Sequence, residues 1–416
     1  MIIRSGRHIH HDFTDETKEI PVKSFFSKVA AFYLFIVIGL ALNPLRCQGK
    51  PWSTRHQIIR ELCQKGEYRE ARREIERMRR TIEAWPHQDR AQYYDLAGTV
   101  HWILADYEKA KTIYQQMKLS AEISGQEDIA FAGKTIVDMI ELFFKGREQR
   151  TQGQRDGSID TFNKVIDISK KMNRPEFEMR CVRQISACHF ELNRFREFYE
   201  CNQQALKIAR ALHSRDDEGM CLNNIGVYFF KTNQYSKAIN AYDASLNIAR
   251  KLENPQFESE CLTNIGMIHK EMGEYEEALR LLYLALSIDK KNKNQEYIAI
   301  DLNNIGTIYR KKWMESYSDE DLAAAFRAIN ECYRLPVLDK RDYIKMRMAN
   351  NLGVISVDLR NYESALNYFQ QGKRLADKNK DREAASNIYI GHGVALKHMG
   401  REEEALSFFR DAISLA

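Results

Sequence analysis

One short phrase recurs at a fixed spacing in the middle of the chain. It reads CLNNIG at residues 221–226, CLTNIG at 261–266 and DLNNIG at 301–306. A second phrase follows the first two copies, as YSKA at 235–238 and YEEA at 275–278. A fixed period of about 40 residues is typical of a repeat array, in which each unit contacts mainly its neighbours. The sequence therefore predicts a chain of stacked units, and its length of 416 residues does not count domains.

Looser forms of the second phrase, in which a large residue stands three positions before a small one, recur along the chain. Each occurrence marks one unit. The markers mostly keep the same spacing and predict about nine helical hairpins. Only 7 prolines and 20 glycines occur in the chain, which favours helices. Two spacings are longer, so we expect extended connections at residues 146–157 and 311–320. The marker residues are Ala71, Ala110, Ser158, Phe198, Ala238, Ala278, Ala325, Ala365 and Ala405.

Glycine recurs inside the predicted first helix of most units. In a helix interior it costs about 1 kcal/mol relative to alanine, so its return needs a physical reason. We expect that the absent side chain lets the first helix approach the second, where small residues such as Ala278 also keep the crossing tight. The recurring glycines are Gly98, Gly226, Gly266, Gly306, Gly353 and Gly393.

These two helices together resemble the tetratricopeptide repeat, in the long-period form found in kinesin light chains and in bacterial sensor and regulator proteins. The resemblance covers residues 55–416 and is strongest from residue 217 onward. It implies an all-α fold, a right-handed α-solenoid (superhelix) of about nine hairpins occupying residues 48–416. The first unit has Ile59 and the fourth has Ser186 where glycine is expected. Equivalent binding by the early units is therefore not implied.

Asparagine recurs at one mid-helix position, although its amide competes for backbone hydrogen bonds and makes it a mediocre helix former. The position lies off the apolar stripe formed by Leu222, Ile225 and Phe229. By resemblance, such asparagines face the concave groove and hold the main chain of a bound peptide, since an amide both donates and accepts. The alternative is that they bond to a neighbouring repeat and align the stack. The candidates are Asn224, Asn264, Asn304 and Asn351, with Asn223, Asn303 and Asn350 beside them.

Basic residues occupy neighbouring positions in the same register. Together with the asparagines they predict a cationic, amide-lined groove suited to an extended acidic segment or a free carboxylate. The alternative is ordinary solvated charge covering a wet groove. The basic candidates are Arg180, Arg183, Lys270, Arg310 and Arg347.

The amino-terminal segment differs from the repeats. Residues 1–21 are polar, and we expect a tail that is disordered or not translated. Lys23 and Lys28 precede an apolar run at 29–42, which is shorter than the roughly 20 residues of a membrane span and suits a signal peptide. Residues 22–47 are therefore expected to be a signal peptide or, if uncleaved, a membrane anchor. Either one places the protein in a bacterial periplasm or cell envelope, with the cytoplasm as the alternative.

Several classes of function are disfavoured. The 63 basic and 58 acidic residues are well mixed, which gives no footprint for nucleic acid. Catalytic and cofactor-binding signatures are missing from the sequence, so we expect no enzyme and no cofactor. Cys181, Cys221 and Cys261 share one repeat position and are expected to be small packing residues, since equivalent positions in a stack lie too far apart for disulfides. No Cys-x-x-Cys pair predicts a metal site.

Two functions remain open. The first is an interaction scaffold or adaptor that binds an extended segment of a protein partner in its groove. The second is a sensory or regulatory input module of a bacterial signalling system, acting on a separate kinase or DNA-binding protein. The last hairpin reaches Ala416 without a polar capping helix. We therefore expect either self-association through this hairpin or a shortened relative of a longer sensor.

Overall fold

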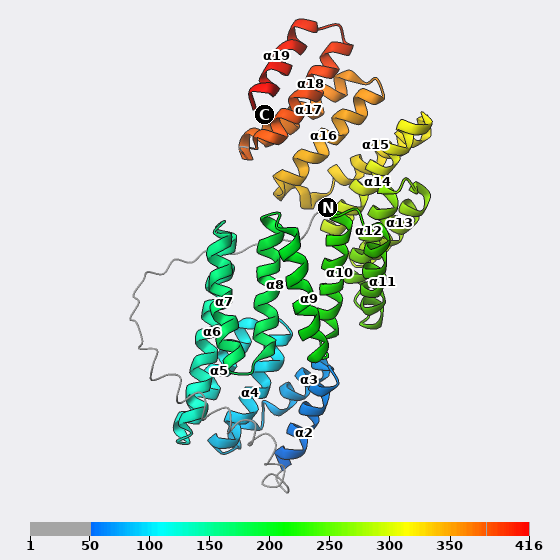
Figure 1. Ribbon diagram of the computed structural model, residues 1–416. Coiled ribbons are helices and arrows are strands. Elements are labelled where there is room, and N and C mark those ends of the chain that lie inside the picture. Colours follow the sequence, from blue (N-terminus) through cyan, green and yellow to red (C-terminus); the bar gives the residue numbers. More distant parts are fainter. Residues whose placement is uncertain (1–50, 380, 416) are drawn as a thin grey trace. The chain divides into compact units, whose positions relative to one another are not determined.

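The computed structural model describes residues 51–379 and 381–415, and within these ranges the regular structure is entirely helical (Figure 1). In chain order, the described residues form 18 α-helices, two for each predicted repeat, which confirms the all-α repeat fold. Their bounds are α2 (Pro51–Gln64), α3 (Tyr68–Met78), α4 (His87–Ile103), α5 (Tyr107–Ile123), α6 (Glu127–Thr151), α7 (Arg155–Lys171), α8 (Pro175–Glu191), α9 (Phe195–Ala211), α10 (Arg215–Lys231), α11 (Tyr235–Lys251), α12 (Pro255–Glu271), α13 (Tyr275–Lys291), α14 (Gln295–Ser316), α15 (Asp319–Tyr333), α16 (Asp342–Asp358), α17 (Tyr362–Asn379), α18 (Arg382–His398) and α19 (Glu402–Leu415). Short 3-10 turns occupy Ile82–Ala84 and Pro336–Lys340.

The repeat period follows from a regular alternation of helix and turn. Each helix from α7 to α13 has 17 residues and is followed by a short turn of constant length. The middle residue of these turns is often left-handed, with φ of 56° at Asn193 and 79° at Gly273. Glycine and asparagine, which accept this conformation most readily, occupy four of the seven turns that follow α7 to α13. His213, Glu253 and Lys293 adopt it in the other three. Successive first helices therefore begin at Arg215, Pro255 and Gln295, which reproduces the spacing of the sequence repeat.

The extra residues of the two longer units lengthen helices. The prediction of extended connections at 146–157 and 311–320 is wrong, because helix α6 continues for 25 residues and helix α14 for 22. Gly146 lies inside α6 and is buried against the ring of Phe162. The helical hydrogen bonds continue through the insertion.

The glycines provide space, but mostly for a large side chain of the second helix. A Cβ placed on Gly98 would lie 2.7 Å from the ring of Tyr114, and one on Gly353 would lie 2.5 Å from the ring of Phe369. The marker residues of the second helices are buried as well, each with at most 3% of its surface exposed. The prediction of close helix approach is confirmed, and its main cause is an aromatic or aliphatic residue packed onto glycine.

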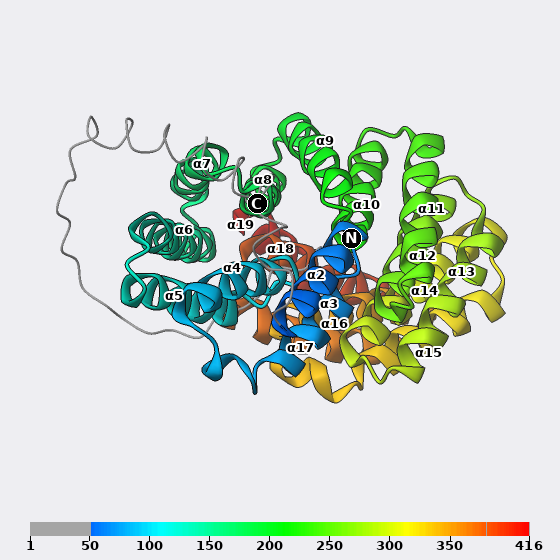
Figure 2. The ribbon, with the colours of Figure 1, turned by 90° about the horizontal axis from the view of Figure 1, so that it is seen from below.

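The chain divides into two compact units, and each is described separately: an N-terminal unit ending at Thr232 and a C-terminal unit from Asn233 to Ala416. The helices of the N-terminal unit curve round in order from α4 to α10 (Figure 2), and α3 contacts the turn that follows α9. The hydroxyl of Tyr68 on α3 donates to the carbonyl of Leu212, at 2.6 Å. This contact joins the first hairpin to the fourth.

Aromatic packing holds the centre of the N-terminal unit. Trp102 on α4 is fully buried and stacks on Phe177 of α8, with ring centroids 4.1 Å apart. Its Nε1 donates to the carbonyl of Glu176 at 3.1 Å. Helix α4 therefore packs directly on α8, and the inner side of this unit is occupied by its own residues.

Two hydrophobic clusters of the C-terminal unit each span neighbouring hairpins. Leu282, Leu302 and Ile329 belong to the first, which joins α13 to α16. Phe369 and Ile388 belong to the second, which joins α16 to α18. Since each core spans neighbouring hairpins, the unit stacks as a repeat array should.

The expectation of an exported or membrane-anchored protein is corrected by the structure. Across residues 51–379 and 381–415, no helix is long and apolar enough to span a bilayer. The segments on which the expectation was based, 1–21 and 22–47, lie outside the described residues.

The cysteines at the shared repeat position are packing residues, as predicted. Cys181, Cys221 and Cys261 are fully buried and unpaired. Burial raises the pKa of the Cys221 and Cys261 thiols to about 12 in each case, which keeps them protonated and unreactive. Within the described part of the chain, no group of three or more ligands is placed to hold a metal ion.

Candidate functional site

The predicted binding residues lie partly in the C-terminal unit and partly in the N-terminal unit, and their surroundings differ between the two units. The C-terminal unit carries asparagines on the first helices of consecutive hairpins, on α12, α14, α16 and α18. Most of them are half-buried, and Asn387 on α18 is exposed. We call this set the asparagine face. Its members are Asn264, Asn303, Asn304, Asn350, Asn351 and Asn387.

A pocket of about 250 Å³ opens on the asparagine face between α16 and α18. Its volume is below the range of small-molecule sites, about 300–1,000 Å³, and is closer to the size of one amino-acid side chain. The lining combines amides, a guanidinium group and aliphatic carbon. Its residues are Met346, Arg347, Asn350, Asn351, Ala384, Asn387 and Ile388.

Two polar groups of the pocket are open to a ligand. The Oδ1 atom of Asn350 is buried and accepts no hydrogen bond from the described residues. A buried acceptor without a donor costs about 1–3 kcal/mol, so a ligand N–H at this place would be favourable. Arg347 is exposed, and its guanidinium carbon lies 5.9 Å from the ring centroid of Tyr343. No carboxylate of the described residues forms an ion pair with Arg347.

Other asparagines of the face help to align the stack. Asn351 Nδ2 donates to Asn303 Oδ1 at 3.0 Å, and this bond joins α16 to α14 across two hairpins. The side chain of Asn304 has no hydrogen-bond partner among the described residues and is half-buried. The face therefore has an aligning bond at Asn351, as the alternative considered from the sequence expects, while a binding role for Asn304 and Asn350 stays a prediction.

The predicted cations nearby are already paired. Arg310 Nε lies 2.7 Å from Asp358 Oδ2, and Lys270 Nζ lies 3.2 Å from Glu271 Oε1. Such pairs reduce the positive charge that the face presents. Among the predicted basic residues of this unit, Arg347 alone lacks a carboxylate partner within the described ranges.

In the N-terminal unit, the predicted arginines are structural. Arg180 Nη1 lies 2.8 Å from Asp217 Oδ1, and the same guanidinium donates to the carbonyl of Ile103. Arg183 also pairs with Asp217, which is 1% exposed and accepts from Ser214 Oγ at 2.7 Å. Burial opposes ionisation of Asp217, but the two arginines outweigh it and the pKa of Asp217 is lowered. These arginines join α4, α8 and α10 and do not face a ligand groove.

The N-terminal asparagines are part of a buried polar chain. Asn224 Nδ2 donates to Asn202 Oδ1 at 2.9 Å, and Asn202 Nδ2 donates to Ser186 Oγ at 2.6 Å. Asn223 is half-buried beside Asn224. Sequence reasoning misses Asn202, although a signal exists: Ser186 replaces the recurring glycine, and Asn202 on the next helix replaces the large residue that packs on it.

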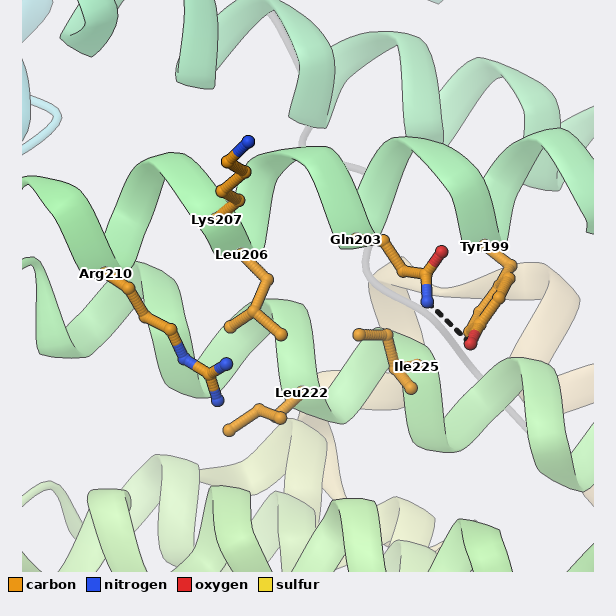
Figure 3. A pocket seen from close by; sticks show the side chains of 7 residues that line it. All are labelled: Tyr199, Gln203, Leu206, Lys207, Arg210, Leu222 and Ile225. Carbon is orange, nitrogen blue, oxygen red and sulfur yellow. Dashed lines mark hydrogen bonds between the residues drawn. The ribbon is translucent and has the colours of Figure 1, made fainter.

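A second hollow lies in the N-terminal unit between α9 and α10 (Figure 3). It is open, about 450 Å³ in volume, and mixes the stripe residues Leu222 and Ile225 with polar side chains of α9. Within it, Gln203 Nε2 donates to Tyr199 Oη at 2.7 Å, and Arg210 pairs with Glu218 at 2.9 Å. These bonds occupy three of the polar side chains that line the hollow, and Lys207 is the remaining one.

Family models agree with the repeat register. Two models, both described as tetratricopeptide repeat, match the chain, one at residues 178–251 and 345–416 and the other at 259–290. No curated protein matches the sequence significantly.

Solved structures with the same fold share little sequence with this chain. A STAND signal-transduction ATPase with a tetratricopeptide repeat sensor, from Pyrococcus horikoshii, matches 78% of this chain and 52% of its own, with 13% identity and a TM-score of 0.58. The apo form of RapI matches 67% and 97%, with 16% identity and a TM-score of 0.51. The apo quorum sensor NprR from B. thuringiensis matches 79% and 98%, with 15% identity and a TM-score of 0.50. At these identities the likeness concerns the fold alone.

Proposed function

Because this chain belongs to the tetratricopeptide-repeat family, we propose that it is a non-enzymatic interaction scaffold, and that its asparagine face binds an extended, acidic segment of a protein partner. The observation that carries the proposal is the pocket between α16 and α18, where the unpartnered Asn350 Oδ1 and the exposed Arg347 lie together. The amide accepts a main-chain N–H of the segment. The guanidinium binds an acidic side chain or a terminal carboxylate.

The rest of the face supports an extended ligand. The pocket has room for about one side chain, while Asn304 presents a further amide on α14. A peptide that spans adjacent first helices can use main-chain hydrogen bonds for affinity and one pocket for specificity, which is a recurring mode of peptide recognition.

The test is selection of random linear peptides by display on the full chain. Wild type is compared with Arg347→Ala/Asn350→Ala and with Arg374→Ala, an exposed arginine on α17 that serves as the charge-matched control. We expect wild type and the control to enrich the same acidic sequences, and the double variant to lose them. Enrichment of the same peptides by the double variant would refute the proposed site.

A regulatory input module is the second candidate. Asn351 and Asn303 join α16 to α14 on the same face, so a ligand bound there acts directly on the packing between repeats. Two proteins of this fold are described as sensors, a quorum sensor and the sensor of a signal-transduction ATPase. Small-angle scattering with and without an enriched peptide separates the two candidates. A change of dimensions on binding favours the input module, and unchanged dimensions favour the scaffold.

A further inference from the structure

Two buried aspartates face each other at the interface between α13 and α14. Asp289 is fully buried, and Asp301 is 1% exposed. They lie on either side of the turn that joins two hairpins. The same two positions hold small uncharged residues at the three preceding interfaces, where a carboxyl pair is absent. The equivalent pairs are Ala249 with Cys261, Ala209 with Cys221, and Ser169 with Cys181, all fully buried.

One oxygen of each carboxyl group accepts a hydrogen bond from a hydroxyl group of α12. Ser259 Oγ donates to Asp289 Oδ2, and Thr263 Oγ1 donates to Asp301 Oδ1 at 2.8 Å. The other two oxygens, Asp289 Oδ1 and Asp301 Oδ2, are buried and have no donor among the described residues. The two hydroxyls come from successive turns of α12, so they hold the two carboxyl groups at neighbouring places. Besides burial, the Asp289 carboxyl also acts on Asp301 and helps to raise its pKa. One proton held between them would satisfy both remaining oxygens.

Neither carboxyl group of the pair forms an ion pair with a cation of the described residues. Burial has the largest effect on the pKa of both carboxyl groups, and it is followed by the two hydroxyls of α12 and the carboxyl groups themselves. No lysine, arginine or histidine of the described residues contributes to either aspartate. Two negative charges buried next to each other away from water would cost much free energy. Protonation of the pair removes one of the charges and lowers that cost.

We propose that Asp289 and Asp301 form a proton-sharing carboxyl pair that makes the packing of α14 on α13 depend on pH. The pair is a conformational device separate from the proposed binding site. Loss of the shared proton leaves two buried carboxylates and weakens this one interface. The neighbouring interfaces, with Ala249 and Cys261 in the same places, have no such dependence.

The direction of the effect follows from the proton balance. Burial raises the pKa of both aspartates, and the neighbouring Asp289 carboxyl raises that of Asp301 further, to about 8. In the unfolded chain the value is about 3.9. Stability from the bound proton is therefore complete below the unfolded value and declines as the pH rises to about 8. In that range the opening equilibrium should increase about tenfold per pH unit, and it should level off above it.

Hydrogen exchange of the full chain, read as protection factors for the amides of α13 and α14, tests the proposal. We expect protection in wild type to fall about tenfold per pH unit between about pH 6 and 8. Amides of α18 in the same molecule should lack this slope. The matched variant is Asp289→Ala/Asp301→Cys, kept reduced, which reproduces the Ala249 and Cys261 interface and should be flat. A flat wild-type profile, or an equal slope in the variant, would overturn the proposal.

Two further measurements test the shared proton in the wild-type protein, so they do not depend on whether Asp289→Ala/Asp301→Cys folds. Infrared spectroscopy of wild type at neutral pH should show the carbonyl band of a protonated carboxylic acid, and Asp289→Asn/Asp301→Asn should remove it. Absence of that band in wild type contradicts the shared proton. Added Ca²⁺ or Mg²⁺ should leave the exchange slope unchanged. If either ion abolishes the slope, the two carboxylates bind a cation and the proposal is wrong.

Discussion

Replacement of Gly353 by alanine tests the packing rule of the hairpins. The added Cβ would lie 2.5, 2.7 and 2.8 Å from three ring atoms of Phe369, well inside the ordinary contact distance. The ring cannot simply retreat, because a Cβ on Gly391 of α18 would lie 2.5 Å from the same ring. The matched substitution is Gly266→Ala, whose Cβ would lie 3.3 Å from both the carbonyl oxygen of Ala278 and Leu282 Cγ, a tight but much milder contact.

The two variants share one favourable effect and differ in the clash. Each gains about 1 kcal/mol of helix propensity. Overpacking at Gly353 costs about 1–3 kcal/mol, because a fully buried ring has no free volume to move into. We therefore expect Gly353→Ala to be about 1–3 kcal/mol less stable than Gly266→Ala. For a unit of this size, each kcal/mol shifts Tm by about 2–4 °C.

Chemical denaturation of both variants, followed by far-ultraviolet circular dichroism, measures this difference. A double variant, Gly353→Ala/Phe369→Leu, imitates the arrangement of Gly266 with Leu282 and should recover part of the loss. The coupling between the two substitutions should be favourable by about 1 kcal/mol or more. Equal stability of the two single variants, or zero coupling in the double variant, would refute the packing rule.

Other expectations concern the N-terminal unit. Arg180→Ala leaves Asp217 with Arg183 and Ser214 as partners and should destabilise the unit by about 1.5–3 kcal/mol in urea denaturation; an unchanged urea midpoint would contradict the structural role of Arg180. Because the pKa of Asp217 is lowered on folding, its stabilisation is present above the ordinary carboxylate range and is lost on acidification, so urea midpoints should fall below about pH 4. Asn202→Ala removes the partner of Ser186 and Asn224 and should cost about 1–3 kcal/mol, with an unchanged melt as the contrary result.

The repeat architecture could be predicted from the sequence because it is set by local signals. Turn residues such as Asn193 and Gly273 end helices at regular intervals, and the marker residues identify the second helix of each pair. The spacing also locates the insertions at 146–157 and 311–320, but the expectation of loops there is wrong. The spacing of the marker residues shows only that residues are inserted. It does not tell whether the inserted residues lengthen a helix or the connection between two helices.

The roles of the polar residues could not be predicted in the same way. Arg180 occupies a register that resembles that of Arg347, yet it is buried because α8 packs on α4 in the N-terminal unit. Its contact with Ile103 joins residues 77 positions apart, a separation that no local pattern reports. Asn224 and Asn351 are equivalent in the repeat, but one bonds to Asn202 within its unit's core and the other joins two hairpins. Equivalent positions therefore take different roles when their surroundings differ.

The central claim is that Arg347 binds an acidic group of an extended peptide on the asparagine face. The measurement is isothermal titration of a display-selected peptide against wild type and Arg347→Ala. The same titrations are repeated with a peptide whose acidic residue is changed to the amide. The four affinities give the coupling free energy between Arg347 and the acidic group of the peptide. We predict that the amide change weakens binding to wild type at least about fivefold, as expected for a loss of roughly 1 kcal/mol, and has little effect on the variant. Equal weakening in both proteins would contradict the account.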